Sequence, residues 1–133
     1  MFNDNEIISS YTRKEAIADK QQFNVDDYDI NIRRDTGIKI PVYITDNIMT
    51  IVETSAKVSN DSISWILFDI CNMCAVFARH NRATSNFKFP VAIKYINKAK
   101  QLDIRDHYFY SEIGANDIDD PNPVITIMSN MDL

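Results

Sequence analysis

Three aspartates near the end of the chain have a spacing that could support metal chemistry. Asp117, Asp119 and Asp120 lie within the segment GANDIDDPNP. Hard cations such as Ca²⁺ and Mg²⁺ bind where several carboxylate oxygens converge from one short loop. The segment lacks the glycine and the distal glutamate of an EF-hand loop, and acids beside Asn and Pro are typical of turns. We therefore expect a turn and no bound metal, with a metal-dependent enzyme as an alternative.

A second group combines basic and aromatic side chains around the segment NKAKQLD. Lysine and arginine neutralise phosphates, and tyrosine rings stack on bases, so such a group can bind nucleic acid. The alternative is a solvated turn whose lysines prevent pairing between sheet edges. The residues of this basic group are Lys94, Lys98, Lys100, Arg105, Tyr108 and Tyr110.

Two triplets of acids suggest the opposite kind of surface. Together they could form a negative face that meets a basic, nucleic-acid-binding groove on another protein. An ordinary solvated surface would explain the same acids. The triplets are Asp26, Asp27 and Asp29, and Asp117, Asp119 and Asp120.

Nucleophilic catalysis has little support in the sequence. Cys71 and Cys74 form a C-x-x-C inside a helical apolar pattern, with no second pair of cysteines to complete a four-cysteine zinc site. We expect both to be buried free thiols. The histidines are His80 and His107, and neither a G-x-S-x-G motif nor a glycine-rich phosphate loop occurs. The sequence therefore predicts no catalytic residue, no cofactor and no enzyme activity.

The apolar pattern predicts helices in the first part of the chain. Thr12 and Glu15 form a capping box that opens a helix ending near residue 19. A short helical turn should end at Gly37, and a helix should run from residue 46 to about 58. The longest helix is predicted from a cap at Asn60 or Asp61 to about residue 80, with one apolar stripe that includes Ile66, Ile70 and Phe77.

Alternating apolar residues predict strands elsewhere. One strand covers residues 38–44, where Pro41 indicates an edge or irregular position. Further strands are expected at 87–96, 104–113 and 124–128, the last after an acidic loop at 114–123. The sequence therefore predicts one α+β domain over residues 1–133, with an antiparallel sheet of three to four strands covered by a long central helix plus shorter helices.

Composition and charge limit the class of protein. Apolar residues make up 45% and charged residues 25% of the 133 positions, as in a soluble globular domain. No secretion signal or apolar run long enough for a membrane is visible, so a cytoplasmic location without membrane contact is expected. The net charge of −5 divides into −4 for residues 1–61, +5 for 62–105 and −6 for 106–133.

Three segments carry a resemblance to a known family. IISSYTRKEAIAD (Ile7–Asp19), GIKIPVYITD (Gly37–Asp46) and DDPNPVITIM (Asp119–Met128) resemble small uncharacterised proteins, a domain of unknown function, carried on phages, plasmids and other mobile elements. Relatives usually have glycine where this chain has Lys20, so that helix end should be strained or built differently. The resemblance implies an accessory protein of a mobile element.

These observations leave three functional hypotheses. The first is a non-catalytic inhibitor, similar to anti-CRISPR proteins, whose acidic face binds a host defence nuclease or CRISPR effector. The second is a regulatory protein that binds nucleic acid through the basic group. The third is a metal-dependent enzyme that uses the loop at Asp117. We expect the first, with a host protein as the partner.

Overall fold

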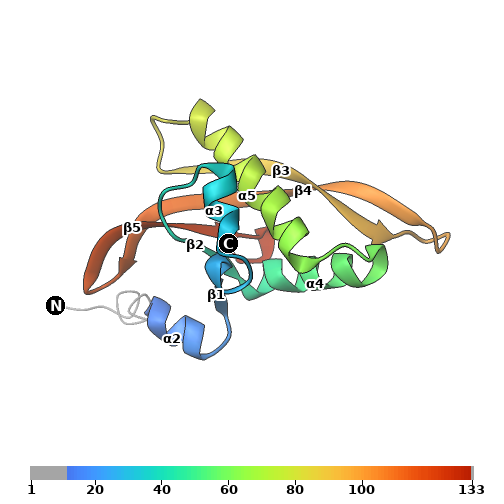
Figure 1. The fold of residues 1–133 in the computed structure, drawn as a ribbon, viewed down its shortest axis with the longest axis horizontal. Coiled ribbons are helices and arrows are strands. Elements are labelled where there is room, and N and C mark those ends of the chain that lie inside the picture. The colour runs from blue at the N-terminus through green and yellow to red at the C-terminus, as the bar shows by residue number, and fades with distance from the viewer. Residues whose placement is uncertain (1–11, 133) are drawn as a thin grey trace.

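The computed structural model describes residues 12–132, which form an α+β fold with one sheet of five strands and four helices (Figure 1). Two short 3₁₀ turns, η1 and η2, accompany them. In chain order the elements are α2 (Arg13–Ala18), β1 (Gln22–Asn24), η1 (Val25–Asp27), α3 (Asn31–Thr36), β2 (Val42–Thr45), α4 (Asp46–Ser59), α5 (Ile63–His80), β3 (Asn86–Ile96), β4 (Leu102–Asp117), β5 (Asp120–Met128) and η2 (Asn130–Asp132).

The sheet is mixed, with the strand order β1-β2-β5-β4-β3. β5 runs parallel to β2 and antiparallel to β4, and the other neighbours are antiparallel. The prediction of an antiparallel sheet of three to four strands is therefore wrong in both respects. The parallel contact forms because it places Ile44 beside Ile127, and both side chains are fully buried. β1 has only three residues, too few for a periodic pattern.

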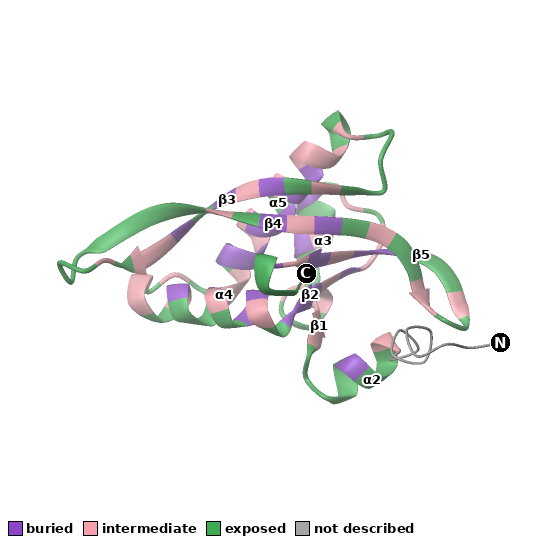
Figure 2. Cartoon of the chain, turned by 180° about the vertical axis from the view of Figure 1, so that it is seen from behind, coloured by how far each residue is buried: buried purple, intermediate pink, exposed green. Residues whose placement is uncertain are grey.

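Helices α3, α4 and α5 contribute to the apolar core on one face of the sheet (Figure 1), and the opposite face is turned to the viewer in Figure 2. α5 is the longest helix but is not clearly central, contrary to the prediction, because α3 and α4 also pack into this layer. Its residues Ile66 and Ile70 are buried as predicted, and Phe77 is partly buried against the same core. No helix within residues 12–132 is long and apolar enough to cross a membrane.

Several helix ends lie at or near the positions predicted from the sequence. The Thr12 hydroxyl accepts a hydrogen bond from the Glu15 amide at 3.0 Å, so the predicted cap forms, whereas residues 7–11 of the first matched segment lie outside the described residues. Lys20 adopts a φ of 59°, the left-handed conformation that glycine favours. Gly37 ends α3 at a φ of 79°. The cap of α5 is Ser62, one or two residues after the predicted position.

The strand boundaries differ more from the predicted ones than the helix ends do. β2 begins at Val42, so the predicted strand loses its first half, and Pro41 lies just before it with its carbonyl accepting from the Ile125 amide at 2.9 Å. The predicted acidic loop is mostly strand, because β4 reaches Asp117 and β5 starts at Asp120. Pairing across the hairpin extends both strands through glycine and proline positions whose local preference is for loop.

Candidate functional site

The β3–β4 hairpin extends past the helices as a two-stranded arm (Figures 1 and 2). We define the arm as residues 92–106, where Ala92 pairs with Asp106. In the described sheet β3 is the last strand, and β4 pairs with β5 only from Tyr110 onward, so both edges of the arm are open. All residues from 98 to 106 are exposed. Ile93 at the base of the arm is still buried, but the rest is a hairpin with open edges, which is suited to contact with another molecule.

A tight turn forms the tip of the arm. The Lys100 amide donates to the Asn97 carbonyl at 2.9 Å, and the Asn97 amide donates to the Gln101 carbonyl at 2.9 Å. The Gln101 amide donates to the Asn97 side chain at 3.0 Å. Lys100 closes the turn with a φ of 61°, a conformation that most side chains avoid. The turn thereby places Lys98 and Lys100 together at the far end of the arm, where both are exposed.

The two faces of the arm differ in chemistry because side chains alternate along each strand. On one face the Arg105 guanidinium lies 4.6 Å from the centre of the Tyr95 ring, and the Tyr95 hydroxyl donates to Asp103 at 3.4 Å. The other face carries three apolar side chains in register, which we call the apolar face of the arm. They are Ile96, Leu102 and Ile104, with exposed fractions of 46%, 52% and 58%.

The structure brings together two of the six residues of the predicted basic group, Lys98 and Lys100, which lie at the tip. Arg105 pairs with Ile93 toward the base of the arm, on the face with Tyr95. Lys94 pairs with Ile104, and its ammonium group donates to the Asp61 carboxylate at 3.0 Å. This ion pair connects the arm to the segment before α5.

The two predicted tyrosines lie closer to the centre of the sheet. Tyr108 is 54% exposed, and the Lys88 ammonium lies 5.1 Å from the centre of its ring. Tyr110 pairs with Met128 of β5 and is only partly exposed. Tyr108 and Tyr110 are separated from Leu102 and Ile104 by even numbers of residues along β4, so their side chains lie on the same face of the strand. They extend the apolar face of the arm toward the centre of the sheet.

Sequence reasoning missed the apolar face and Lys88. A signal was present in the spacing: Leu102 and Ile104 are separated from the buried Phe109 by odd numbers of residues. Within one strand, an odd separation places side chains on opposite faces. Leu102 and Ile104 therefore could not join the core together with Phe109.

The first acidic triplet makes local contacts. Asp26 binds the Arg33 guanidinium through both carboxylate oxygens, with a shortest distance of 2.8 Å, and this hydrogen bonding raises the pKa of Arg33. Asp29 accepts from the Asn31 amide at 2.9 Å at the start of α3. Asp27 is exposed. One of the three acids is therefore already paired with a cation.

The second triplet lies at the β4–β5 turn. Hydrogen bonds from the amides of Ile118 and Lys14 hold the pKa of Asp117 below its usual value, and hydrogen bonds from Asn116 and Asn122 do the same for Asp120. Asp119 is exposed.

The two triplets lie on different parts of the fold, the first around η1 and the second at the end of the sheet beside α2 (Figure 1). The structure therefore does not combine them into one continuous acidic face. Among residues 12–132, no group of three or more His, Cys, Asp and Glu side chains is arranged to hold a metal ion.

The thiols and imidazoles lie where packing explains them. Cys71 and Cys74 are fully buried free thiols, as predicted. Burial raises the pKa of Cys74 to about 11 and raises the pKa of Cys71 further, which disfavours the reactive thiolate. His80 lies with Nδ1 2.9 Å from the Val76 carbonyl at the end of α5. Partial burial, together with Arg105, lowers the pKa of His107.

Comparison of the chain with protein-family models, with curated proteins and with solved structures gives no significant match.

Proposed function

We propose that this protein is a non-catalytic binding protein of a mobile element and that its arm binds nucleic acid. The observation that carries the proposal is the row of exposed basic side chains on the arm, with Lys98 and Lys100 at its tip and Arg105 toward its base. Within residues 12–132, Lys98, Lys100 and Arg105 have no ion pair, although the chain as a whole has an excess of acids. The three sequence segments that resemble a mobile-element family support the biological setting.

The shape of the arm suits a nucleic-acid groove. A two-stranded β-ribbon fits the major groove of B-form DNA, and several DNA-binding proteins read the groove with strands. The lysines at the tip can contact phosphates, while Arg105 on the ring of Tyr95 offers a flat cationic surface. We therefore propose duplex DNA as the nucleic acid, with the arm in the major groove.

The charge distribution would orient such a complex. The arm contains four bases and two acids, whereas the whole chain carries a net charge of −5. Phosphates attract the arm and repel the acidic remainder, so the molecule should approach DNA tip first. Because few cations take part, binding should be modest and strongly weakened by salt.

Fluorescence anisotropy with a labelled DNA duplex tests the proposal. If three phosphate contacts form, the logarithm of the affinity should fall with the logarithm of salt concentration with a slope of about −2.7. Replacing Lys98, Lys100 and Arg105 together by Gln should weaken binding at least tenfold and flatten this slope. The matched control replaces Lys14, Lys20 and Lys57, which are exposed and outside the arm, by Gln. An equal loss in the control, or no binding by the unmodified protein at low salt, would contradict the proposal.

A second candidate is the inhibitor of a host defence nuclease, and the apolar face of the arm favours it. Exposed side chains such as Leu102 and Ile104 are better suited to a protein partner than to phosphates. Replacing both by Ser should abolish capture of a nuclease from host lysate if the partner is a protein. The same replacement should leave DNA affinity within about twofold if the tip lysines carry binding.

A further inference from the structure

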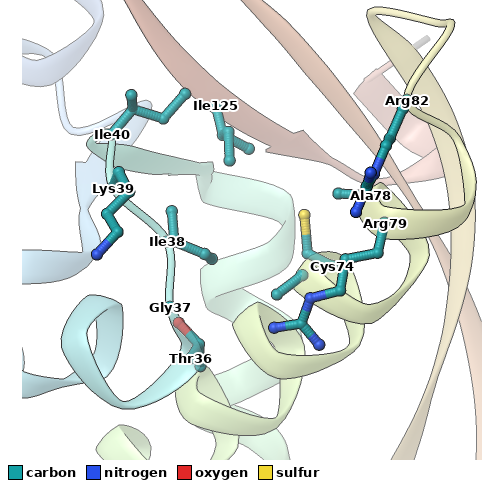
Figure 3. A pocket seen from close by; sticks show the side chains of 11 residues that line it. Thr36, Gly37, Ile38, Lys39, Ile40, Cys74, Ala78, Arg79, Arg82 and Ile125 are labelled. Carbon is teal, nitrogen blue, oxygen red and sulfur yellow. The ribbon is translucent and has the colours of Figure 1, made fainter.

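A cavity of about 340 Å³ lies between the segment Gly37–Ile40 and the C-terminal half of α5 (Figure 3). The cavity exists because this segment is not part of a strand, although its alternating isoleucines predicted one. Ala75 and Ala78 on α5 are small and leave room where longer side chains would fill the gap. Ile38, Ile40 and Ile125 complete an apolar wall.

Two arginines border this apolar wall. Arg79 extends from α5 toward Gly37, and its Nη2 would lie 3.8 Å from a Cβ built on that glycine. Arg82, just after the end of α5, points back toward Ala78 (Figure 3). Within residues 12–132, neither guanidinium group has an ion pair, and no acidic residue lines the cavity. The cavity therefore combines an apolar wall with uncompensated positive charge.

The arginines are not required to complete the helix. The carbonyls at the end of α5 already have partners: His80 Nδ1 lies 2.9 Å from Val76 O, and the Asn81 side chain donates to Phe77 O at 2.7 Å. The Asn81 amide donates to Ala78 O at 3.2 Å. Because these groups are satisfied, both guanidinium groups remain available to a ligand.

We propose that this cavity binds a small organic phosphate, with the phosphate between Arg79 and Arg82 and the organic part against the isoleucines and alanines. Guanidinium groups match phosphate oxygens in a bidentate geometry. A phosphate monoester carries nearly two negative charges at neutral pH, so it balances the charge of two arginines. A carboxylate ligand carries only one negative charge and would balance one of them. The volume lies near the lower end of the range for small-molecule sites, roughly 300–1,000 Å³.

This site is independent of the proposed DNA-binding arm. The arm contacts the segment before α5 through the pair of Lys94 with Asp61, whereas the cavity lies at the other end of that helix. α5 has 18 residues, which at a rise of 1.5 Å each span roughly 27 Å. Loss of binding at one site should therefore leave the other site intact.

Calorimetric and NMR titration with phenyl phosphate tests the proposal, with inorganic phosphate, benzyl alcohol and benzoate as comparison ligands. Phenyl phosphate should bind at least tenfold more tightly than each of the others, because it alone combines the apolar group with two charges. Replacing Arg79 and Arg82 by Gln should weaken its binding at least tenfold. The matched control is Arg34→Gln, which removes one exposed guanidinium from α3 outside the cavity.

A second variant tests the apolar part. Ala78→Leu should fill the cavity and reduce phenyl phosphate binding at least tenfold, while an unchanged far-UV spectrum and amide NMR pattern elsewhere would show that the fold is kept. Equal affinity for inorganic phosphate would overturn the proposal, since charge alone would then explain binding. Equal affinity for benzoate would overturn the assignment to phosphate, and an equal loss with Arg34→Gln would overturn the location.

Discussion

The two halves of the β3–β4 hairpin place their apolar side chains on opposite faces. In the inner half, Phe89 and Phe109 are buried toward the helices, with ring centres 6.2 Å apart in an edge-to-face arrangement. In the outer half, Ile96, Leu102 and Ile104 lie on the face that the helices do not cover, and about half of each is exposed. One pair of strands thus carries two apolar surfaces, and the described structure covers only one of them.

This difference indicates that the inner half of the hairpin stabilises the fold, whereas the outer half is available for binding. Burial of apolar area contributes roughly 25 cal/mol per Å², so the inner half is stabilised by its contact with the helices. The outer half receives little of this stabilisation and depends on cross-strand hydrogen bonds and on its turn. Its exposed side chains are therefore free to serve binding, and substitutions there should affect partners more than stability.

The largest expected effect is the loss of unfolding free energy when an isoleucine of the core, rather than one of the apolar face of the arm, is truncated. Ile70 on α5 is fully buried, so Ile70→Ala should reduce the free energy of unfolding by about 2–5 kcal/mol. Ile104→Ala removes the same atoms from a residue that is 58% exposed and should cost less than about 0.5 kcal/mol. Urea denaturation of both variants measures the difference. Equal losses would show that the outer half is as well packed as the core, which contradicts the comparison.

The sequence predicted α5 and the strands of the β3–β4 hairpin well and the number of strands in the sheet poorly, for a physical reason. The helix from 63 to 80 and the strand from 86 to 96 have long periodic patterns, because one side of each is buried. Burial of Ile66 and Ile70 followed from the same pattern. The number of strands did not follow, because the three-residue β1 is too short for a pattern and the β2–β5 contact joins segments about eighty residues apart.

The candidate sites show the same limit. Sequence alone placed Lys98 and Lys100 together because they are two residues apart in one turn, whereas Arg105 pairs with Ile93 toward the base of the arm. It could not foresee that Lys94 pairs with Asp61, since that contact depends on where α5 begins relative to the sheet. The cavity at Arg79 was also not predicted, because its walls come from separate segments and from the lack of a strand at residues 37–41.

The next effect concerns Asp132 of η2, which connects the segment after β5 to the end of β2 and the start of α4. Its carboxylate accepts hydrogen bonds from Thr45, Asn47 and the Ser129 amide at 2.6, 2.7 and 2.8 Å. Although partial burial acts in the opposite direction, these bonds hold the pKa of Asp132 below its usual value. Asp132→Asn should lower the free energy of unfolding by about 1–2 kcal/mol at pH 7. Urea denaturation measures this change.

The cost of Asp132→Asn should depend on pH. Because the pKa is depressed in the folded state, the contribution is complete above the unfolded value of about 4 and is lost as the pH falls through the folded pKa. The difference between the unmodified protein and the variant should therefore shrink between about pH 5 and pH 2. A difference that stays constant over this interval would show that the charge of Asp132 does not stabilise these contacts with Thr45, Asn47 and Ser129.

The smallest expected effect is on the stability of the arm when either of its two tip lysines is replaced by glycine. Lys100 has a φ of 61°, whereas Lys98 is not among the described residues with positive φ. Lys100→Gly should relieve strain and stabilise the arm by about 0.5–1 kcal/mol, while Lys98→Gly should destabilise it by a similar amount, because glycine increases the freedom of the unfolded chain. Both variants lose one positive charge at the tip, so both should weaken DNA binding alike.

Hydrogen exchange of the arm amides and urea denaturation would report local and global stability. A change in exchange without a shift of the urea midpoint would show that the arm opens separately from the helix-covered half, whereas equal signs for the two variants would contradict the strain at Lys100.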